Sequence, residues 1–318
     1  MTGMKTTISP KRIPLPDAAR GLALLAMASY HFTWDLEFFG YLAPGTATQG
    51  LWKLYARGIA SSFLFLVGFS LVLAHVHGIR WKPFGKRLAM VAASAAAITV
   101  ATLFAFPATA IYFGILHAIA AASVIGLLFL RLPVAVTLLA AAAVLAAPHY
   151  LHSPAFDSFW LLWLGLGETP PRSNDYVPLL PWLAPVLIGI AAGRLSIRFG
   201  FLEKMAKWRN MPRVLVLAGQ HSLLFYLLHQ PILIGIVYLA SLVYPPPAAD
   251  PSQSYIGSCE TSCTDGGNEP GFCTRFCACT LDRLRQQELL SPFLAGQINP
   301  GEDERIGAIA ESCSLIEE

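Results

Sequence analysis

The chain has 318 residues, of which 55% are hydrophobic and only 13% are charged, and its mean hydropathy is +0.55. A soluble domain carries about 25% charged residues, so a single water-soluble globule is excluded. The formal net charge of +3 is unevenly divided. Residues 1–244 hold 18 Lys and Arg against 7 Asp and Glu, a formal +11, whereas residues 245–318 hold 4 against 12, a formal −8, together with all six cysteines. We therefore expect a transmembrane domain over 1–244, a Pro-rich linker over 245–258 and a Cys-rich tail over 259–318.

Seven apolar segments suit a bilayer, whose hydrocarbon core of about 30 Å takes about 20 helical residues. They cover about residues 17–38, 58–76, 88–106, 111–130, 132–147, 179–197 and 214–243, and we expect the last to be broken near Gln230-Pro231. The aromatic stretch 159–163 is too short to span and is typical of an interfacial anchor. Counting it would give eight spans. The sequence predicts an all-α polytopic transmembrane helix bundle of about seven spans, with a small helical, disulfide-rich C-terminal tail.

The positive-inside rule predicts the orientation of these spans. With a cytoplasmic N-terminus, the inner segments carry 15 basic residues, whereas the outer segments carry only Lys53, Arg57 and Arg172. The inner residues are Lys5, Lys11, Arg12, Arg20, Arg80, Lys82, Lys86, Arg87, Arg131, Arg194, Arg198, Lys204, Lys207, Arg209 and Arg213. Seven spans then place the tail outside, where cysteines are stably oxidised. We expect a multi-pass protein of the bacterial inner membrane with a periplasmic tail.

Ionisable residues line one face of the first span. Because residues eleven apart on a helix differ by only about 20°, Asp17, Arg20, His31 and Asp35 share a narrow stripe. A histidine with a carboxylate one turn away suits a general base, and an arginine suits a phosphate or carboxylate. The structural alternative is that Arg20 snorkels, Asp17 caps the helix, and His31 and Asp35 hydrogen-bond a neighbouring span. Because charge inside a membrane is costly, we favour a functional stripe.

The spacing of Arg20 and His31 resembles the arginine-x10-histidine motif in the first span of the acyltransferase-three membrane family. Over about residues 11–240 the chain is more closely similar to bacterial proteins grouped with the heparan-alpha-glucosaminide N-acetyltransferase catalytic domain. Four segments carry this resemblance: Arg12-Ile-Pro-Leu-Pro-Asp17-Ala-Ala-Arg20-Gly21-Leu-Ala-Leu-Leu-Ala-Met27, Tyr30-His31-Phe-Thr-Trp-Asp35-Leu, Phe63-Leu-Phe-Leu-Val-Gly68-Phe-Ser70 and Asp175-Tyr-Val-Pro-Leu-Leu-Pro181-Trp182.

The resemblance implies transfer of an acetyl or other acyl group from acetyl-CoA, or another acyl-CoA, to a glycan or lipid-linked sugar. The lysosomal enzyme's histidine lies in the loop after the first span, but the corresponding loop here, about 37–57, contains no histidine. The catalytic role therefore falls to His31 and Asp35, which argues against an acetyl-histidine intermediate.

Other polar residues are candidates for substrate binding. His117 either lines the same cavity or is a buried hydrogen-bonding residue, and we favour the latter. Tyr226 and His229 share a face of the last span, either as a second wall of the site or as contacts between helices. Arg57 either binds substrate or anchors the second span at the interface. Asp175 lies in a segment that carries the resemblance. The pair His149 and His152 offers too few ligands for a metal, and we expect none.

The tail repeats a Cys-x3-Cys pattern, which puts thiols one turn apart on facing helices and suits two cross-helix disulfides. Cys279 with Cys313 would complete three. Because six cysteines permit fifteen connectivities, spacing does not fix the pairing of Cys259, Cys263, Cys273, Cys277, Cys279 and Cys313. Zinc is the alternative, and the external location with no histidine nearby favours disulfides.

The leading hypothesis is thus an integral membrane acyltransferase of the cell envelope. Its expected partners are membrane lipid, a small-molecule acyl donor and a glycan or lipid-linked acceptor; a homo-oligomer is left open. The alternatives are a proton-coupled transporter or permease, in which the stripe is a relay, and a non-catalytic membrane scaffold. We find no paired halves of the kind that transporters often show. Nucleic-acid binding has no support, because topology explains the basic loops.

Overall fold

The computed structural model describes residues 13–43, 45–208, 210–247, 250–301 and 303–315. Lys5, Lys11, Arg12 and Arg209, which contributed to the predicted orientation, lie outside these ranges. The described residues form helices and connections without a strand, which confirms the all-α prediction. They separate into two compact units: residues up to Phe32 with Gln49–Ile234, and Thr33–Thr48 with the residues from Gly235 onward.

The membrane part contains nine α-helices in its described residues. They are α1 (Pro14–Phe38), α2 (Gly50–Ala74), α3 (Trp81–Ala105), α4 (Ile115–Phe129), α5 (Val134–Tyr150), α6 (Leu179–Arg198), α7 (Phe201–Lys207), α8 (Arg213–Gln220) and α9 (Ser222–Val243). Four of them, α2, α3, α6 and α9, are long and apolar enough to cross a membrane, and α4 and α5 are shorter apolar helices. The chain is therefore a multi-pass membrane protein. Seven crossings, with α1 as the first, stay a prediction.

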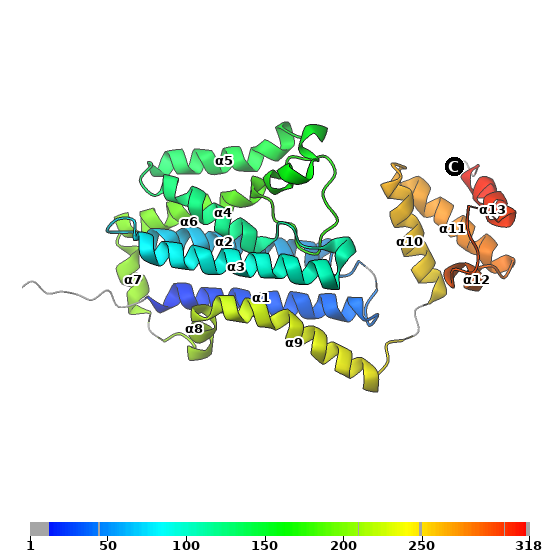
Figure 1. Cartoon of the computed structure of the whole chain (residues 1–318), viewed down its shortest axis with the longest axis horizontal. Helices are drawn as coiled ribbons and strands as arrows, with labels where there is room; N and C mark the ends of the chain where they lie inside the picture. Colours follow the sequence, from blue (N-terminus) through cyan, green and yellow to red (C-terminus); the bar gives the residue numbers. More distant parts are fainter. Residues whose placement is uncertain (1–12, 44, 209, 248–249, 302, 316–318) are drawn as a thin grey trace, which may run out of the picture. The chain divides into compact units, whose positions relative to one another are not determined.

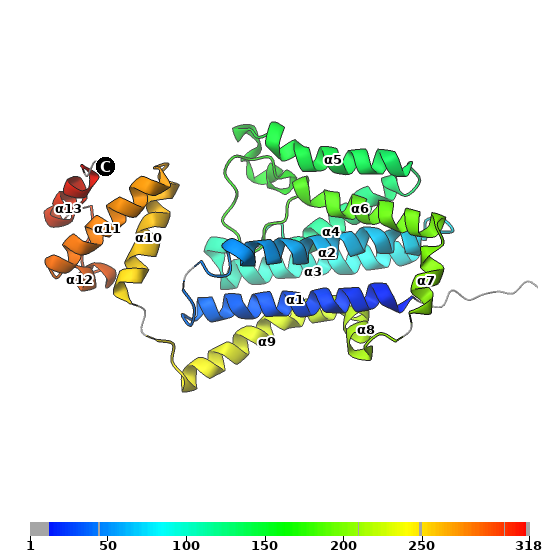
Figure 2. The ribbon, with the colours of Figure 1, turned by 180° about the vertical axis from the view of Figure 1, so that it is seen from behind.

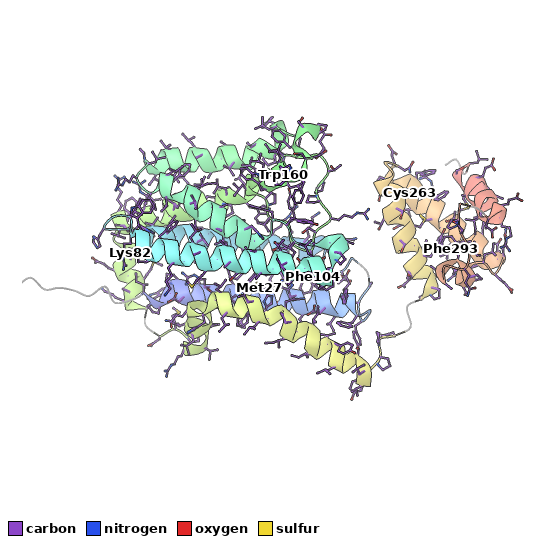
Figure 3. All side chains as sticks on the ribbon, viewed as in Figure 1. Met27, Lys82, Phe104, Trp160, Cys263 and Phe293 are labelled. Carbon is purple, nitrogen blue, oxygen red and sulfur yellow. A yellow bond between two sulfur atoms is a disulfide. The ribbon has the colours of Figure 1, made fainter. Side chains whose placement is uncertain are left out.

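Helices α1 to α6 run in roughly the same direction, and the short helix α7 lies across their ends (Figures 1 and 2). Lys82 and Phe104 lie toward opposite ends of α3 (Figure 3), as expected for a helix that crosses a membrane. Three short 3₁₀ helices, η1 (Pro107–Thr109), η2 (Pro154–Phe156) and η3 (Phe159–Leu164), lie in the connections. Helix η3 holds the aromatic stretch, and its six residues are too few to form an eighth span.

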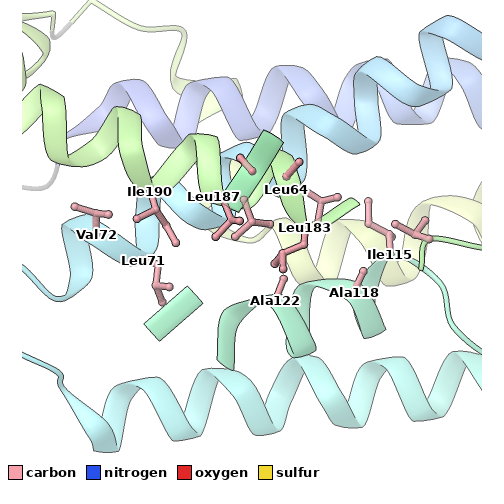
Figure 4. Close-up of a cluster of buried hydrophobic side chains, with 13 residues drawn as sticks. Leu64, Leu71, Val72, Ile115, Ala118, Ala122, Leu183, Leu187 and Ile190 are labelled. Carbon is pink, nitrogen blue, oxygen red and sulfur yellow. The ribbon is translucent and has the colours of Figure 1, made fainter. Parts of the chain in front are cut away.

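The core of this unit is the contact between α2, α4 and α6. Leu64 and Leu71 of α2 meet Leu187 and Ile190 of α6, while Ala118 of α4 packs against the same cluster (Figure 4). Glycine allows the α2 and α6 backbones to touch: a Cβ at Gly68 would lie 1.9 Å from the Val186 carbonyl oxygen, and one at Gly189 would lie 2.1 Å from the Phe65 carbonyl oxygen. Such close approach of small residues is typical of membrane helix pairs.

The break in the last apolar segment lies at His221, between α8 and α9, so the expectation of a break near Gln230-Pro231 was wrong. Pro231 lies inside α9 without ending it, because a membrane helix tolerates the loss of one backbone hydrogen bond. At the observed break, α8 is packed tightly against α1. A Cβ at Gly219 would lie 1.8 Å from the Asp17 carbonyl oxygen, and one at Gly21 would lie 2.1 Å from the Leu215 carbonyl oxygen.

The tail contains α10 (Pro251–Asp265), α11 (Pro270–Gln286), α12 (Leu290–Leu294) and α13 (Glu304–Ser314). Helix α10 begins within the stretch 245–258 that was expected to be linker. Cys259–Cys277 and Cys263–Cys273 join α10 to α11, and Cys279–Cys313 joins α11 to α13, so the predicted cross-helix disulfides are confirmed. A small core around Leu284 and Ile309 lies between the helices, and the buried Tyr255 hydroxyl donates a hydrogen bond to Thr280 Oγ1 at 2.8 Å.

Candidate functional site

One end of α1 carries a guanidinium group held by two helices. Arg20 Nη1 pairs with Asp17 Oδ1 at 2.6 Å, one turn earlier on α1, and Arg20 Nη2 donates to Ser70 Oγ of α2 at 2.7 Å. Asp17 is buried and Arg20 is partly buried. Among the described residues, two of the five N–H groups of the guanidinium are used to fix its plane, and the others could bind a ligand anion.

Further cations lie near this end. Arg87 of α3 is close enough to Arg20 for the two guanidinium groups to repel each other. Arg87 also lines a cavity of about 120 Å³ together with Arg80 and His75. The His75 Nδ1–H donates to the Leu71 carbonyl oxygen at 2.8 Å, which leaves Nε2 as an acceptor; this buried atom has no hydrogen-bond partner in the described part of the chain. The arrangement favours a small group that carries both negative charge and a proton donor, such as a phosphate.

Eleven residues beyond Arg20, His31 meets His229 of α9. Their ring centroids are 4.9 Å apart and the rings lie edge to face. The ring centroid of Tyr226 of α9 lies 5.6 Å from that of His229, and Tyr226 also packs against a buried cluster that contains Leu24 and Met27. The structure therefore brings His31 of the first span together with His229 and Tyr226 of the last span.

The hydrogen bonds of His229 define its tautomer. His229 Nδ1 lies 2.7 Å from the Tyr226 carbonyl oxygen, and because a carbonyl only accepts, Nδ1 carries the proton. Nε2 is then a lone-pair acceptor. It is buried and lacks a hydrogen-bond partner among the residues that the structure covers, while the whole residue is 8% exposed. A buried acceptor of this kind is costly unless a ligand or water satisfies it.

Asp175 lies in the connection between α5 and α6, at the first turn of α4. Its Oδ2 accepts a hydrogen bond from the Ile115 backbone N–H at 2.8 Å. Asp175 is partly buried, and desolvation by the surrounding protein raises its pKa to about 6, although the hydrogen bond from Ile115 acts in the opposite direction. Asp175 also interacts electrostatically with Tyr226. Because the Tyr226 ring contacts His229, the segment that holds Asp175 belongs to the same site.

His117 is satisfied by local hydrogen bonds. Its Nδ1 accepts from the Gly114 backbone N–H at 3.2 Å, so the neutral ring carries its proton on Nε2 and can donate it to Thr99 Oγ1 at 3.3 Å. The Thr99 hydroxyl in turn donates to the Ile111 carbonyl oxygen at 2.7 Å. These bonds support the structural interpretation, in which His117 ties the start of α4 to α3.

The remaining two predicted site residues lie on α1 and α2. Asp35 is on α1 within the second compact unit and is fully buried. Arg57 is on α2 and exposed, as expected of an interface anchor. No group of three or more His, Cys, Asp and Glu side chains that could hold a metal occurs among the described residues.

The sequence did not single out Ser70 or Arg87 as site residues. Ser70 lies at the end of a segment that carries the family resemblance, but the sequence does not show that it lies close to Arg20. Arg87 was considered only as one of the basic residues that predict the orientation of the spans.

Residues 12–231 match the family model described as Heparan-alpha-glucosaminide N-acetyltransferase, catalytic. No curated protein and no solved structure matches the chain.

Proposed function

Because the chain belongs to the heparan-alpha-glucosaminide N-acetyltransferase catalytic-domain family, an acetyltransferase family that uses acetyl-CoA, we propose that it transfers an acetyl or other acyl group to a cell-envelope glycan or lipid-linked sugar. The protein is proposed to lie in a bacterial inner membrane with its N-terminus in the cytoplasm and its tail in the periplasm. The charge distribution of the loops supports this orientation.

The observation that carries the proposal is the layout of α1. A cationic group, Arg20 held by Asp17 and Ser70, lies at one end of the helix, and the His31–His229 pair lies about 16 Å further along its axis. An anion-binding group and a proton acceptor separated in this way suit a long donor whose phosphates and thioester lie at opposite ends. All of these residues fall within the region that matches the family.

In the proposed reaction, His31 takes a proton from an amine or hydroxyl of the acceptor while the nitrogen or oxygen attacks the thioester carbonyl carbon. The tetrahedral intermediate then breaks its C–S bond, and the departing thiolate takes the proton from the imidazolium. The acetyl group has moved, coenzyme A leaves as the thiol, and His31 is neutral again. Asp35, one helical turn beyond His31 in the sequence, is proposed to stabilise the imidazolium.

At the donor end, the guanidinium groups of Arg20 and Arg87 are proposed to bind phosphate groups of the acyl-CoA. The cavity beside Arg87, at about 120 Å³, is smaller than the roughly 300–1,000 Å³ of sites that enclose whole small molecules. It therefore suits one phosphate or a similar fragment, with the remainder of the donor lying along α1. Asp175 and Tyr226 are proposed to bind the acceptor sugar, since Tyr226 lies beside the His229 ring and interacts electrostatically with Asp175.

The proposal is tested with the purified full chain in lipid nanodiscs, using acetyl-CoA as donor and methyl glucosaminide as a soluble acceptor. We expect Arg20→Ala to abolish measurable acetyl-CoA binding and His31→Ala to retain binding while losing turnover. Arg131→Gln, which removes an exposed cation elsewhere, should behave as wild type. If the wild-type protein neither binds acetyl-CoA nor releases coenzyme A, the proposal fails in favour of the transporter.

A further inference from the structure

A groove runs along α9 where this helix faces α1 and α8. It has a volume of about 390 Å³, within the roughly 300–1,000 Å³ of small-molecule sites. Its lining is apolar except for two histidines, His221 and His229. The lining residues are Ala28, Ala218, His221, Leu224, Phe225, Leu228, His229, Ile232 and Leu233.

One lining residue of the groove, His229, carries a buried polar atom that lacks a partner among the described residues. His229 is more than nine-tenths buried, its Nδ1–H is used by the Tyr226 carbonyl oxygen, and its Nε2 has no hydrogen-bond partner in the described part of the chain. His31 lies beside it, with the ring centroids 4.9 Å apart. An amine or hydroxyl that entered the groove would satisfy Nε2 and at the same time lie next to the proposed general base.

The walls of the groove do not suit a water-soluble ligand. Among the described residues, no Lys or Arg lines the groove, whereas Arg80 and Arg87 line the cavity proposed for the donor. Several of the walls belong to α9, a helix of membrane length, and Leu224, Leu228 and Ile232 remain about half exposed at its surface. In a bilayer such a surface faces lipid chains, so the groove is accessible from the hydrocarbon layer.

We propose that this groove binds the hydrocarbon chain of a lipid-linked acceptor, with the acceptor's amine or hydroxyl against His229 Nε2 and His31. The inference rests on the proposed acetyl transfer and narrows its acceptor from a glycan in general to a sugar on a lipid chain. Donor and acceptor then reach His31 by separate routes: the donor past the cations near Arg20, and the acceptor sideways from the membrane.

The test uses a hexadecyl glucosaminide that carries a photoreactive diazirine in its chain, added to the full-length protein in nanodiscs. We expect the label to map by mass spectrometry to peptides spanning Ala218–Leu233. Ile232→Trp, which narrows the groove, should lower this labelling at least about fivefold, since each displaced methylene changes an equilibrium about fourfold. Ile236→Trp is the matched control: both isoleucines are 54% exposed on α9, but only Ile232 lines the groove.

A second pair repeats the comparison at other positions: Leu228→Trp in the groove should lower labelling, and Leu239→Trp outside it should not. Labelling needs no acetyl-CoA, so its outcome is independent of turnover. Labelling of the groove without any acetyl transfer would support the lipid site and contradict the proposed reaction. Acetyl transfer to methyl glucosaminide, with the label spread evenly over α9, would support the proposed reaction and contradict the proposal that the groove binds the acceptor's chain. Equal labelling by a diazirine phosphatidylcholine without a sugar would also overturn it.

Discussion

His31 of α1 and His229 of α9 face each other edge to face, with ring centroids 4.9 Å apart, although 198 positions separate them in the sequence. His229 donates its Nδ1 proton to a carbonyl oxygen of its own helix and therefore presents an acceptor at Nε2. Two imidazoles in this arrangement can act on one acceptor group, His229 by orienting it and His31 by taking its proton. The pair therefore makes a prediction about how the two substitutions combine.

We expect His31→Ala to lower kcat about 10²–10⁴-fold, the usual contribution of a general base. His229→Ala should mainly raise the KM for the acceptor, by about tenfold. The double variant should lose less than the product of the two effects, because both rings act on the same acceptor group. Steady-state kinetics with methyl glucosaminide measures this. His77→Ala, at an exposed position, is the control, and strictly multiplicative effects would show that the two rings act independently.

The Arg20 site makes a separate prediction about donor binding. Ser70→Ala removes the 2.7 Å hydrogen bond that orients the guanidinium, and a hydrogen bond to a charged group is worth about 1.5–3 kcal/mol. We expect the Kd for acetyl-CoA to rise about tenfold. Arg20→Lys should weaken binding at least as much, because an ammonium keeps the charge but not the planar fork. Isothermal titration with acetyl-CoA measures both, and a Kd unchanged in Arg20→Lys would show that charge alone matters.

Local periodicity was sufficient to predict the α1 stripe. Asp17, Arg20 and His31 share a face because positions three and eleven to fourteen residues apart recur on one side of any α-helix, and the Arg20–Asp17 ion pair confirms that relationship. The tail's cross-helix disulfides follow from the same reasoning, since Cys-x3-Cys spacing places both thiols on one helix face.

The contacts between helices were beyond such reasoning. Ser70 lies 50 positions from Arg20, and its approach depends on how α2 packs against α1. The break at His221 was likewise missed, because proline is the stronger local signal, whereas the tight contact of Gly219 with the Asp17 carbonyl oxygen is a tertiary effect. His229 was predicted either as one wall of a site or as a contact between helices, and only the packing identifies His31 as its neighbour.

The α2–α6 contact predicts a stability effect with an internal control. At Gly68 a new Cβ would lie 1.9 Å from the Val186 carbonyl oxygen, so Gly68→Ala must separate two backbones. We expect a loss of about 1–3 kcal/mol, as for other overpacked cores, and a fall in the thermal midpoint in detergent. Gly58→Ala on the same helix meets nothing within 4 Å and should be neutral or slightly stabilising. Equal midpoints for the two variants would contradict the packing.

Asp175 predicts a pH dependence of stability. Burial raises its pKa in the folded protein to about 6, whereas an unfolded aspartate titrates near about 3.9. Between these values the folded state binds more protons, so the contribution of Asp175 to stability falls as the pH rises from about 4 to about 6 and stays low above it. Asp175→Asn keeps an acceptor for the Ile115 N–H without the charge.

The variant should therefore gain stability relative to wild type as the pH is raised through this window. Thermal midpoints of both proteins, measured in the same detergent at pH 4.5, 5.5 and 7.5, give the difference directly. Parallel curves for the two proteins would show that the carboxyl group is solvated and that its pKa is not raised.

The disulfides of the tail predict an order of resistance to protease. Each closes a loop, and loop-closure entropy makes a crosslink worth about 2–4 kcal/mol, more for longer loops. Cys279–Cys313 spans 34 residues and is the covalent link from α13 to α11, whereas Cys263–Cys273 spans 10 residues inside the hairpin that Cys259–Cys277 already closes. Paired Cys→Ser substitution at Cys279 and Cys313 should therefore lower the stability of the tail more than substitution of either other pair.

Limited proteolysis of the oxidised full chain measures this order, because cleavage tracks the population of the opened tail when reclosing is fast. A loss of about 2–3 kcal/mol corresponds to tail cleavage about 30- to 150-fold faster, with the membrane part as the internal reference. Paired substitution at Cys263 and Cys273 should give a smaller acceleration, since the outer crosslink still holds α10 to α11. If the inner pair proved the more sensitive, α13 would be held by its packing around Ile309 and not by its crosslink.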